Sequence, residues 1–322
     1  MGEFELLDRI RARLPQPGPQ VLLGSGDDAA ITIPGGATAT SVDALVDGVH
    51  FRRAWFSSAQ IGAKALAVAL SDLAAVGAEP GEAYVVLGIP ADLDEDGCLE
   101  LLDGMAKVAE ETGTTLAGGD VTRAPVLTLA ITVVGHAKSA ADLVTRSGAQ
   151  PGDALVVTGE LAAAAAGLLL LEDSDVRSSL AAHRDTSDDR GRPLIARQLE
   201  PKPRLKAGRE LAAAGATAMI DLSDGLGGDA NHLARASGVG LGIDASALPL
   251  ADGVTDLTLA VSGGEDYELL AALPEERLAE AEAAVESHGG LTRIGTVVAG
   301  EGVEIRLPGG ELLEPRGFDQ LG

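Results

Sequence analysis

Acidic residues beside glycine or serine recur along this chain, and their side chains are the ones best suited to chemistry. The first group, GSGDDAA, fits the loose dinucleotide-loop pattern G-x-G-x-x-A. Such a loop should open a helix whose N-terminus receives a pyrophosphate. The following ITIPGGATATSV instead has β-branched residues and then a Pro-Gly-Gly turn, which predict a strand and a turn. We therefore interpret Asp27 and Asp28 as candidate metal ligands, with a role as simple turn formers as the alternative.

Three further oxygen donors support a metal site. Ser41 and Asp43 lie two residues apart on a predicted strand, so their side chains share a face. Asp72 falls on the apolar stripe of a predicted helix and should face inward, unless it is only a partly exposed cap. A buried carboxylate without compensation would cost several kcal/mol or be protonated. Oxygen donors without His or Cys favour Mg²⁺.

Three later stretches repeat the pattern of an acidic residue beside glycine. LAGGDVTRA places Gly119 and Asp120 after a short predicted strand. MIDLSDGLGGD runs from a strand ending at Asp221, through Asp224, into a helix. AVSGGEDYEL places Glu265 between two apolar segments. Each stretch could be only a turn or a helix N-cap, which is the common role of Asp, Ser and Gly at such junctions.

Strands and helices alternate in both halves, which indicates a mixed α/β protein. The glycines and the proline of RSGAQPGDALVVTG predict a linker between two domains. The N-terminal domain then covers residues 1–148 and the C-terminal domain residues 149–322. The polar segment 172–192 is expected to be a mobile surface loop. The predicted strands are 20–23, 37–46, 83–89, 126–136, 154–158, 218–222, 240–244, 257–261, 267–272 and 293–298. The predicted helices are 4–14, 59–76, 95–112, 161–171, 204–214, 227–236 and 275–287.

Charge and composition exclude several classes of function. The formal net charge is −25, which argues against a nucleic-acid or anionic membrane surface as partner. The single Cys98 excludes an internal disulfide and fits a reducing compartment. The longest apolar run, residues 161–171, is too short to span a membrane, and the N-terminus has no apolar signal core. We therefore expect a cytoplasmic protein with no membrane partner.

Taken in order, these motifs resemble the thiamine-monophosphate kinase family. They are GSGDDAA, SVDALVDGVHF, ALSDLAAVGA, AGGDVTR, TRSGAQPGD, LEPKPRL, DLSDGLGGD and SGGEDYEL, and the resemblance runs from Asp27 to the final RGFDQLG. That family is one branch of a group that includes aminoimidazole ribonucleotide synthetase and selenophosphate synthetase. The resemblance implies a two-domain fold, with an N-terminal α/β domain that dimerises through its sheet and a C-terminal α+β domain that completes the active site. A homodimer is expected.

The resemblance also implies which residues act. Those that look like ligands of several Mg²⁺ ions are Asp27, Ser41, Val42, Asp43, Asp72, Asp120, Asp221 and Asp224. Those that look like ATP contacts are Gly119, Asp120, Arg146 and Ser223, and those that look like the thiamine monophosphate site are His50, Glu265 and Phe318. At position 42 the family often has Thr, so Val42 would offer only its backbone carbonyl.

The implied reaction transfers the γ-phosphoryl group of ATP to thiamine monophosphate, giving thiamine diphosphate and ADP. The acceptor phosphate is already anionic, so the task is positioning and charge neutralisation rather than base catalysis. The chain lacks G-x-x-x-x-G-K-[ST], which excludes a P-loop mechanism. Two alternatives remain: another ATP-using enzyme of the same group with a different small acceptor, and a non-catalytic Mg²⁺-nucleotide-binding module.

Overall fold

The computed structural model describes residues 9–10, 12–16, 18–24, 30–173 and 191–318. The chain forms two compact units. One runs to Leu73 and continues over Ala78–Ala140, and the other combines Ala74–Gly77 with the chain from Ala141 onward. The domain boundary expected after residue 148 stays a prediction. Among the described residues, no helix has the length and apolar character to cross a membrane.

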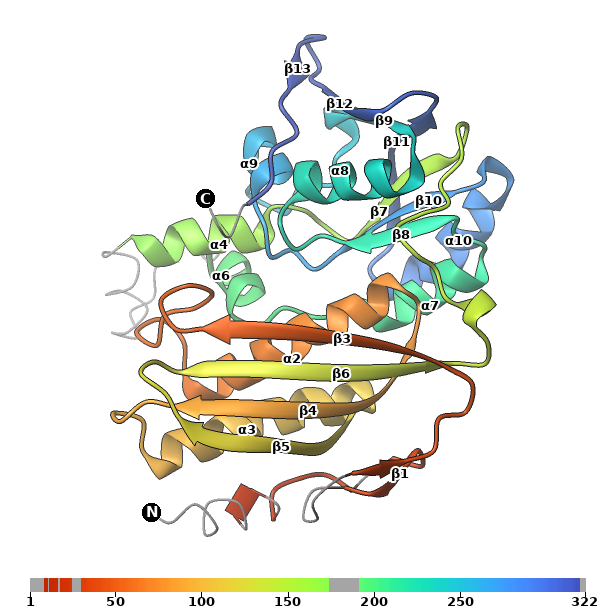
Figure 1. Cartoon of the computed structure of the whole chain (residues 1–322). Coiled ribbons are helices and arrows are strands. Elements are labelled where there is room, and N and C mark those ends of the chain that lie inside the picture. Colours follow the sequence, from red (N-terminus) through yellow and green to blue (C-terminus); the bar gives the residue numbers. More distant parts are fainter. Residues whose placement is uncertain (1–8, 11, 17, 25–29, 174–190, 319–322) are drawn as a thin grey trace. The chain divides into compact units, whose positions relative to one another are not determined.

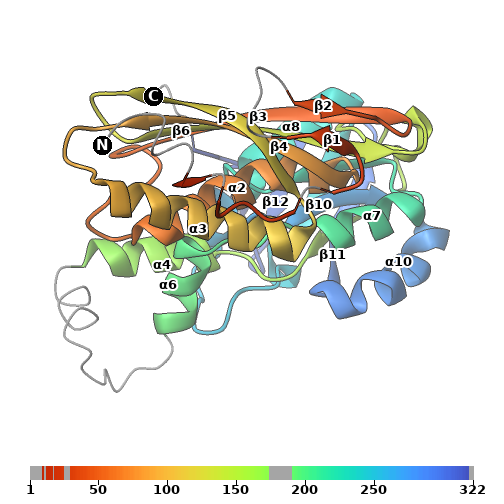
Figure 2. The same ribbon diagram turned by 90° about the horizontal axis from the view of Figure 1, so that it is seen from below.

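The first unit is a sheet covered by two helices. The strand order is β3-β6-β4-β5, and all neighbours are antiparallel except β4 and β5. The strands are β3 (Ala37–Val46), β4 (Glu79–Ile89), β5 (Thr115–Arg123) and β6 (Thr128–Ala137). The helices α2 (Ser58–Ala75) and α3 (Glu95–Thr112) cover one face (Figures 1 and 2). A hairpin of β1 (Val21–Leu23) and β2 (Ile31–Thr32) contacts β5 through β1.

Alternation of side chains along the strands creates the two faces of this sheet. The side chains of Leu129, Ile131 and Val133 on β6 are fully buried. The helices that cover them pack closely because each contributes a glycine at their contact. A Cβ on Gly62 would lie 1.8 Å from the Leu101 carbonyl oxygen, and one on Gly104 would lie 1.9 Å from that of Ala59. The opposite face is more exposed, with Val42 and Val86 exposing 64% and 45% of their surface.

The second unit contains a seven-stranded sheet of order β13-β12-β9-β11-β7-β10-β8. Its strands are β7 (Ala154–Thr158), β8 (Ala218–Asp221), β9 (Gly240–Asp244), β10 (Leu269–Leu273), β11 (Leu291–Val298), β12 (Gly302–Arg306) and β13 (Leu312–Leu313). Its helices are α4 (Ala163–Glu172), α6 (Gly191–Leu199), α7 (Leu205–Ala213), α8 (Leu226–Ser237), α9 (Leu257–Ser262) and α10 (Leu278–Val285). Short 3₁₀ turns lie at Ala140–Asp142, Ala245–Ala247, Glu275–Arg277 and Glu286–His288.

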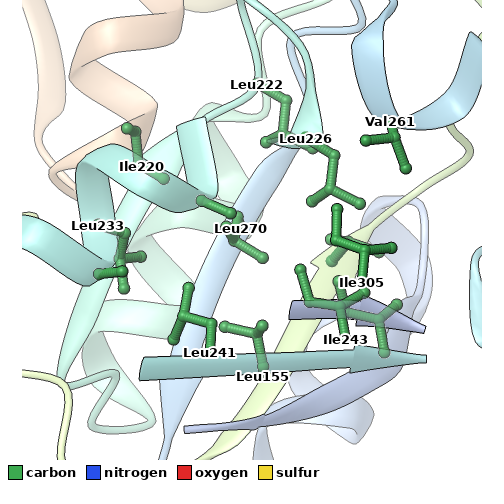
Figure 3. Close-up of a cluster of buried hydrophobic side chains, with 14 of the residues drawn as sticks. Leu155, Ile220, Leu222, Leu226, Leu233, Leu241, Ile243, Val261, Leu270 and Ile305 are labelled. Atoms are coloured by element: carbon green, nitrogen blue, oxygen red, sulfur yellow. The ribbon is translucent and has the colours of Figure 1, made fainter. Parts of the chain in front are cut away.

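An aliphatic core joins this sheet to α8 and α9. Leu155 of β7 and Leu270 of β10 belong to one buried cluster with Leu226 and Leu233 of α8 and Val261 of α9 (Figure 3). The core is built from Ala, Val, Leu and Ile, as expected from a chain with only 2% aromatic residues. It fixes the strand ends from which the acidic residues of this unit project.

Several predicted elements were wrong. The strand expected at 257–261 is helix α9, because the Asp256 side chain accepts hydrogen bonds from the backbone N–H groups of Thr258 and Leu259 and caps a helix there. Gly119 and Asp120 lie within β5 rather than in a turn, so the short strand expected before them continues through the glycines to Arg123. β12, β13 and α6 were missed as well.

Two further predictions fall mainly outside the described residues. Of the helix expected at 4–14, only Arg9 and Ile10 are described as helical. Of the expected loop 172–192, Glu172 belongs to α4 and Gly191 begins α6, while 174–190 lie outside the described residues.

Candidate functional site

Ser41, Asp43 and Asp72 come together in the first unit. Ser41 and Asp43 point from β3 toward α2, and the Ser41 hydroxyl donates a hydrogen bond to Oδ2 of Asp72. Burial, and after it the neighbouring charge of Asp72, together raise the pKa of Asp43 to about 6. The structure therefore brings these three side chains together, and their role as metal ligands stays a prediction. Two crowded carboxylates beside a hydroxyl suit a bound cation.

Asp120 does not join this group within one chain. It lies on β5, at the opposite edge of the sheet from β3, which is roughly 14 Å away at three strand spacings. Its partner in the ladder is Val86, which belongs to the exposed face of the sheet, whereas Asp43 pairs with the buried Ile131. Asp43 and Asp120 thus occupy opposite edges and opposite faces.

The local structure explains why Val42 is exposed and why position 119 is a glycine. The Val42 side chain is 64% exposed and points away from Ser41 and Asp43. A Cβ on Gly119 would lie 2.0 Å from the Val85 carbonyl oxygen, so glycine allows β4 and β5 to pair here. Neither observation tests the role in binding metal or ATP that the resemblance implies for these residues.

Asp27 lies outside the described residues. The described strands on either side of it, β1 and β2, pair with each other, and Ile31 and Thr32 are strand rather than helix residues. This agrees with rejecting the dinucleotide loop. His50 closes the turn after β3: its Nδ1 accepts a hydrogen bond from the Val46 backbone N–H at 3.1 Å. The Nδ1 atom of His50 is therefore occupied by a hydrogen bond within its own turn.

A second acidic group forms at the N-terminal end of α8. Asp221 is buried at the end of β8, and Asp224 follows three residues after it in the loop. Asp229, which was not among the predicted site residues, is 2% exposed and accepts hydrogen bonds from the backbone N–H groups of Ser223 at 3.0 Å and Asp224 at 3.1 Å. Burial, followed by the charges of Asp221 and Asp224, raises the pKa of Asp229 to about 8. The signal was present in DLSDGLGGD, where Asp229 stands in the first helical turn.

The C-terminal segment lies against this loop. The backbone N–H of Phe318 donates a hydrogen bond to the Asp224 carbonyl oxygen at 2.8 Å, and the Phe318 ring is 63% exposed. The close approach of the C-terminal segment to α8 requires glycine in both elements, because a Cβ on Gly228 would lie 2.9 Å from Cα of Gly317. An exposed aromatic ring is thus held beside the acidic group of α8.

Glu265 lies against the same loop. It adopts a left-handed conformation with φ of 70°, and its backbone N–H donates to the Ser223 carbonyl oxygen at 2.8 Å. Asp266 caps α4 by accepting from the N–H groups of Ala162 at 2.7 Å and Ala164 at 3.3 Å. The second unit therefore brings Asp221, Ser223, Asp224, Glu265 and Phe318 together around one strand–helix junction.

Arg146 lies elsewhere in this unit. Its carbonyl oxygen accepts a hydrogen bond from Ser237 at the C-terminal end of α8, whereas Ser223 precedes the N-terminal end of that helix. The 12 residues of α8 span roughly 18 Å. An extended nucleotide is the kind of ligand that would reach both positions.

The chemistry of the donors fits Mg²⁺, although neither unit assembles a complete site. In the parts of the chain that the structure describes, no three Asp, Glu, His or Cys side chains gather closely enough to hold an ion. Each unit nevertheless concentrates oxygen donors, and the pKa of one carboxylate in each group is raised by burial and neighbouring negative charge. A divalent cation would relieve that crowding.

Comparison with known proteins identifies the family. The models of the AIR synthase related protein N-terminal and C-terminal domains match residues 26–137 and 150–308. The thiamine-monophosphate kinase of Escherichia coli (strain K12) is 40% identical over 85% of this chain and 83% of its own length. That of Mycobacterium tuberculosis (strain ATCC 25618 / H37Rv) is 37% identical over 84% and 80%. The chain belongs to the thiamine-monophosphate kinase family.

Solved structures agree with the expected two-domain fold of that family. Thiamine-monophosphate kinase from Stenotrophomonas maltophilia K279a superposes with a TM-score of 0.84 at 36% identity, covering 97% of this chain and 98% of that one. AaThiL complexed with AMPPCP and TMP superposes with a TM-score of 0.74 at 29% identity, covering 98% and 96%. The fold class expected from the sequence is confirmed.

Proposed function

We propose that this protein is a thiamine-monophosphate kinase, which transfers the γ-phosphoryl group of ATP to the phosphate of thiamine monophosphate in thiamine diphosphate biosynthesis. Family membership over most of the chain supports this assignment. The structural observation that carries it is the pair of crowded carboxylates, Asp43 on β3 and Asp72 on α2, with Ser41 of β3 donating a hydrogen bond to Asp72. Such a site attracts a divalent cation, and through it the phosphates of ATP.

The proposed phosphoryl transfer needs little acid–base catalysis. The attacking oxygen belongs to a phosphate that is already anionic, so the obstacle is the mutual repulsion of two phosphorylated molecules. A protein with a formal net charge of −25 adds to that repulsion unless positive charge is supplied locally. The acidic groups therefore act by holding cations in place, and the remaining residues align the two substrates.

We assign the Mg²⁺ ligands to the two acidic groups. Ser41, Asp43 and Asp72 would hold metal in the first unit, and Asp221 and Asp224 in the second, together with Asp27, Asp120 and the backbone of Val42. When bound, Mg²⁺ neutralises phosphate charge on both the attacking and the leaving side. Ser223, Gly119 and Arg146 are assigned to ATP.

The acceptor site is assigned to His50, Glu265 and Phe318. Two of these, Glu265 and Phe318, are tied by backbone hydrogen bonds to Ser223 and Asp224 respectively, which supports a shared location. The exposed Phe318 ring suits contact with a cationic or aromatic heterocycle. The Nδ1 atom of His50 is held by the Val46 N–H, so its Nε2 would face the substrate.

We further infer a cytoplasmic homodimer formed through the exposed face of the four-stranded sheet. The side chains that β3 directs to that face carry no charge: Thr38, Thr40, Val42 and Ala44. Val42 and Val86 expose 64% and 45% of their surface there, which favours burial against a second copy. The strongly acidic charge supports the absence of nucleic-acid and anionic membrane partners.

The deciding experiment is direct. Purified protein incubated with ATP, Mg²⁺ and thiamine monophosphate should yield thiamine diphosphate and ADP in equal amounts, as measured by chromatography. Chelation of Mg²⁺ with EDTA should abolish turnover, and excess Mg²⁺ should restore it. ADP release that is independent of thiamine monophosphate, or that requires a different small phosphate acceptor, would contradict the assignment.

A further inference from the structure

The hydroxyl group of Ser237 is tied to the loop that carries Arg146, 91 residues earlier in the sequence. Ser237 is the last residue of α8, and its Oγ donates a hydrogen bond to the Arg146 carbonyl oxygen at 3.0 Å. The same Oγ accepts hydrogen bonds from the backbone N–H groups of Gly148 and Ala149, each at 3.2 Å. A serine hydroxyl has one donor and two acceptor positions, so all three are used on this loop.

The loop is also anchored to strand β8. The carbonyl oxygen of Thr145 accepts a hydrogen bond from the Met219 backbone N–H at 3.0 Å. Gly148 has a φ of 127°, and a Cβ on it would lie 2.4 Å from the carbonyl oxygen of Thr217, the residue before β8. The backbone of Arg146 is therefore held from both sides, by β8 and by the end of α8.

The side chain of Arg146 differs from its backbone in this respect. Arg146 is exposed, and among the residues that the structure describes its guanidinium group has no hydrogen-bond or ion-pair partner. Arg197 and Arg204 of the same unit, in contrast, both donate to the buried carboxylate of Glu268. A guanidinium group with uncommitted donors on a fixed backbone is suited to bidentate binding of phosphate oxygens.

We infer that Ser237 is a positioning residue for ATP, because it fixes the backbone of residues 146–149 from which the Arg146 guanidinium group reaches the phosphates. The inference rests on the proposed function, in which Arg146 is assigned to ATP. Ser237 acts through Arg146, since its own hydroxyl is fully used on the loop. Without that hydroxyl the loop loses three hydrogen bonds, and ATP must order it on binding at a cost in conformational entropy.

Calorimetry with the β,γ-methylene analogue of ATP and Mg²⁺ tests the inference without turnover. Ser237→Ala should raise the Kd of the analogue about fivefold to tenfold, the scale of one or two lost hydrogen bonds. Arg146→Gln should raise the Kd at least as much, because it removes a charged donor. In the Arg146→Gln background, Ser237→Ala should add less than about a twofold change, because the two residues act as one.

Kinetics and controls separate positioning from loss of structure. In Ser237→Ala protein the KM for ATP should rise about fivefold to tenfold, while the KM for thiamine monophosphate stays within about twofold of wild type. Ser237→Thr keeps the hydroxyl and should restore the KM for ATP. Ser246→Ala makes the same chemical change at a hydroxyl that donates to Asp244 within its own turn, and it should leave both constants unchanged. Thermal unfolding of each variant checks that it is folded.

Failure of the inference and failure of the proposed function give different results. Wild-type protein that binds the ATP analogue but forms no thiamine diphosphate would contradict the proposed function, while calorimetry on the Ser237 and Arg146 variants still decides the inference. A folded Ser237→Ala protein with wild-type affinity for the analogue would overturn the inference. So would an undiminished effect of Ser237→Ala in the Arg146→Gln background, or KM values for ATP and thiamine monophosphate that rise together.

Discussion

The carboxylate of Asp229 shows how one buried residue can organise a site without facing the substrate. Its Oδ2 accepts both N–H groups of the loop that carries Ser223 and Asp224. With its pKa raised to about 8 by burial and by two neighbouring aspartates, it keeps its proton at neutral pH in the absence of a cation. Its role in the free protein is therefore that of a neutral hydrogen-bond acceptor.

This role predicts different outcomes for two substitutions. Asp229→Asn keeps an oxygen that can accept both N–H groups and should retain activity within about threefold of wild type. Asp229→Ala leaves two backbone donors without their acceptor, at a cost of about 1–3 kcal/mol each, and should lower kcat at least tenfold. Steady-state kinetics on both folded variants makes the comparison. Equal loss in both would indicate that the negative charge itself is required.

Asp266 predicts how stability depends on pH. Burial raises its pKa to about 7, against the lowering effect of the Ala162 and Ala164 N–H groups, with Glu268 raising it and Arg197 lowering it. The folded chain therefore keeps a proton that the unfolded chain loses near pH 4. Its stabilising contribution is complete below pH 4 and is lost as the pH rises to about 7. Asp266→Asn should flatten this decline.

Urea unfolding at pH 5, 6, 7 and 8 measures the effect. The wild-type free energy of unfolding should fall more steeply over this interval than that of Asp266→Asn, whatever the variant's absolute stability. Asp244→Asn is the control, because hydrogen bonds from Ser246 lower the pKa of that exposed carboxyl and it stays ionised throughout this range. Its slope should match the wild-type slope. Parallel curves for Asp266→Asn and wild type would contradict the assignment.

At the scale of elements, α8 and the C-terminal segment pack closely because both have glycine at their contact. Gly228→Ala would place a Cβ 2.9 Å from Cα of Gly317 and push the segment carrying Phe318 away from Asp224. We expect the KM for thiamine monophosphate to rise about fivefold to tenfold, with a smaller change in the KM for ATP, since one contact of the proposed acceptor site moves. Substrate-dependent kinetics measures both. Gly309→Ala, where a Cβ meets nothing within 4 Å, should leave them unchanged.

The elements also explain what sequence alone could predict. Helix α3 and strands β3, β7 and β9 were predicted with their observed limits because capping, glycine punctuation and alternation are local signals. Strand β5 was predicted too short because its Gly118-Gly119 pair, which resembles a turn, instead serves close pairing with β4, a strand distant in sequence. The convergence of Ser41, Asp43 and Asp72 followed from side-chain periodicity. The backbone ties among Ser223, Asp224, Glu265 and Phe318 depend on tertiary packing that no local pattern encodes.

At the scale of the whole molecule, the placement of Asp43 and Asp120 bears on assembly. The two residues stand on edge strands β3 and β5, facing opposite sides of one sheet. A single chain cannot bring them to one ion, since roughly 14 Å of sheet separates the strands. If both serve one ATP site, as the family resemblance implies, a second copy must supply one of them. The exposed face that carries Asp120 is the surface through which we propose the dimer forms.

Mixing two inactive variants tests this arrangement. Asp43→Asn and Asp120→Asn should each lower kcat at least 100-fold as homodimers. When the two proteins are combined and exchange subunits, half of the dimers become mixed, and each mixed dimer contains one site with both residues intact. Activity should therefore return to about a quarter of the wild-type value. Mass spectrometry with differently tagged chains confirms the exchange. Full exchange without any recovery would place Asp43 and Asp120 in separate roles and contradict a site shared between subunits.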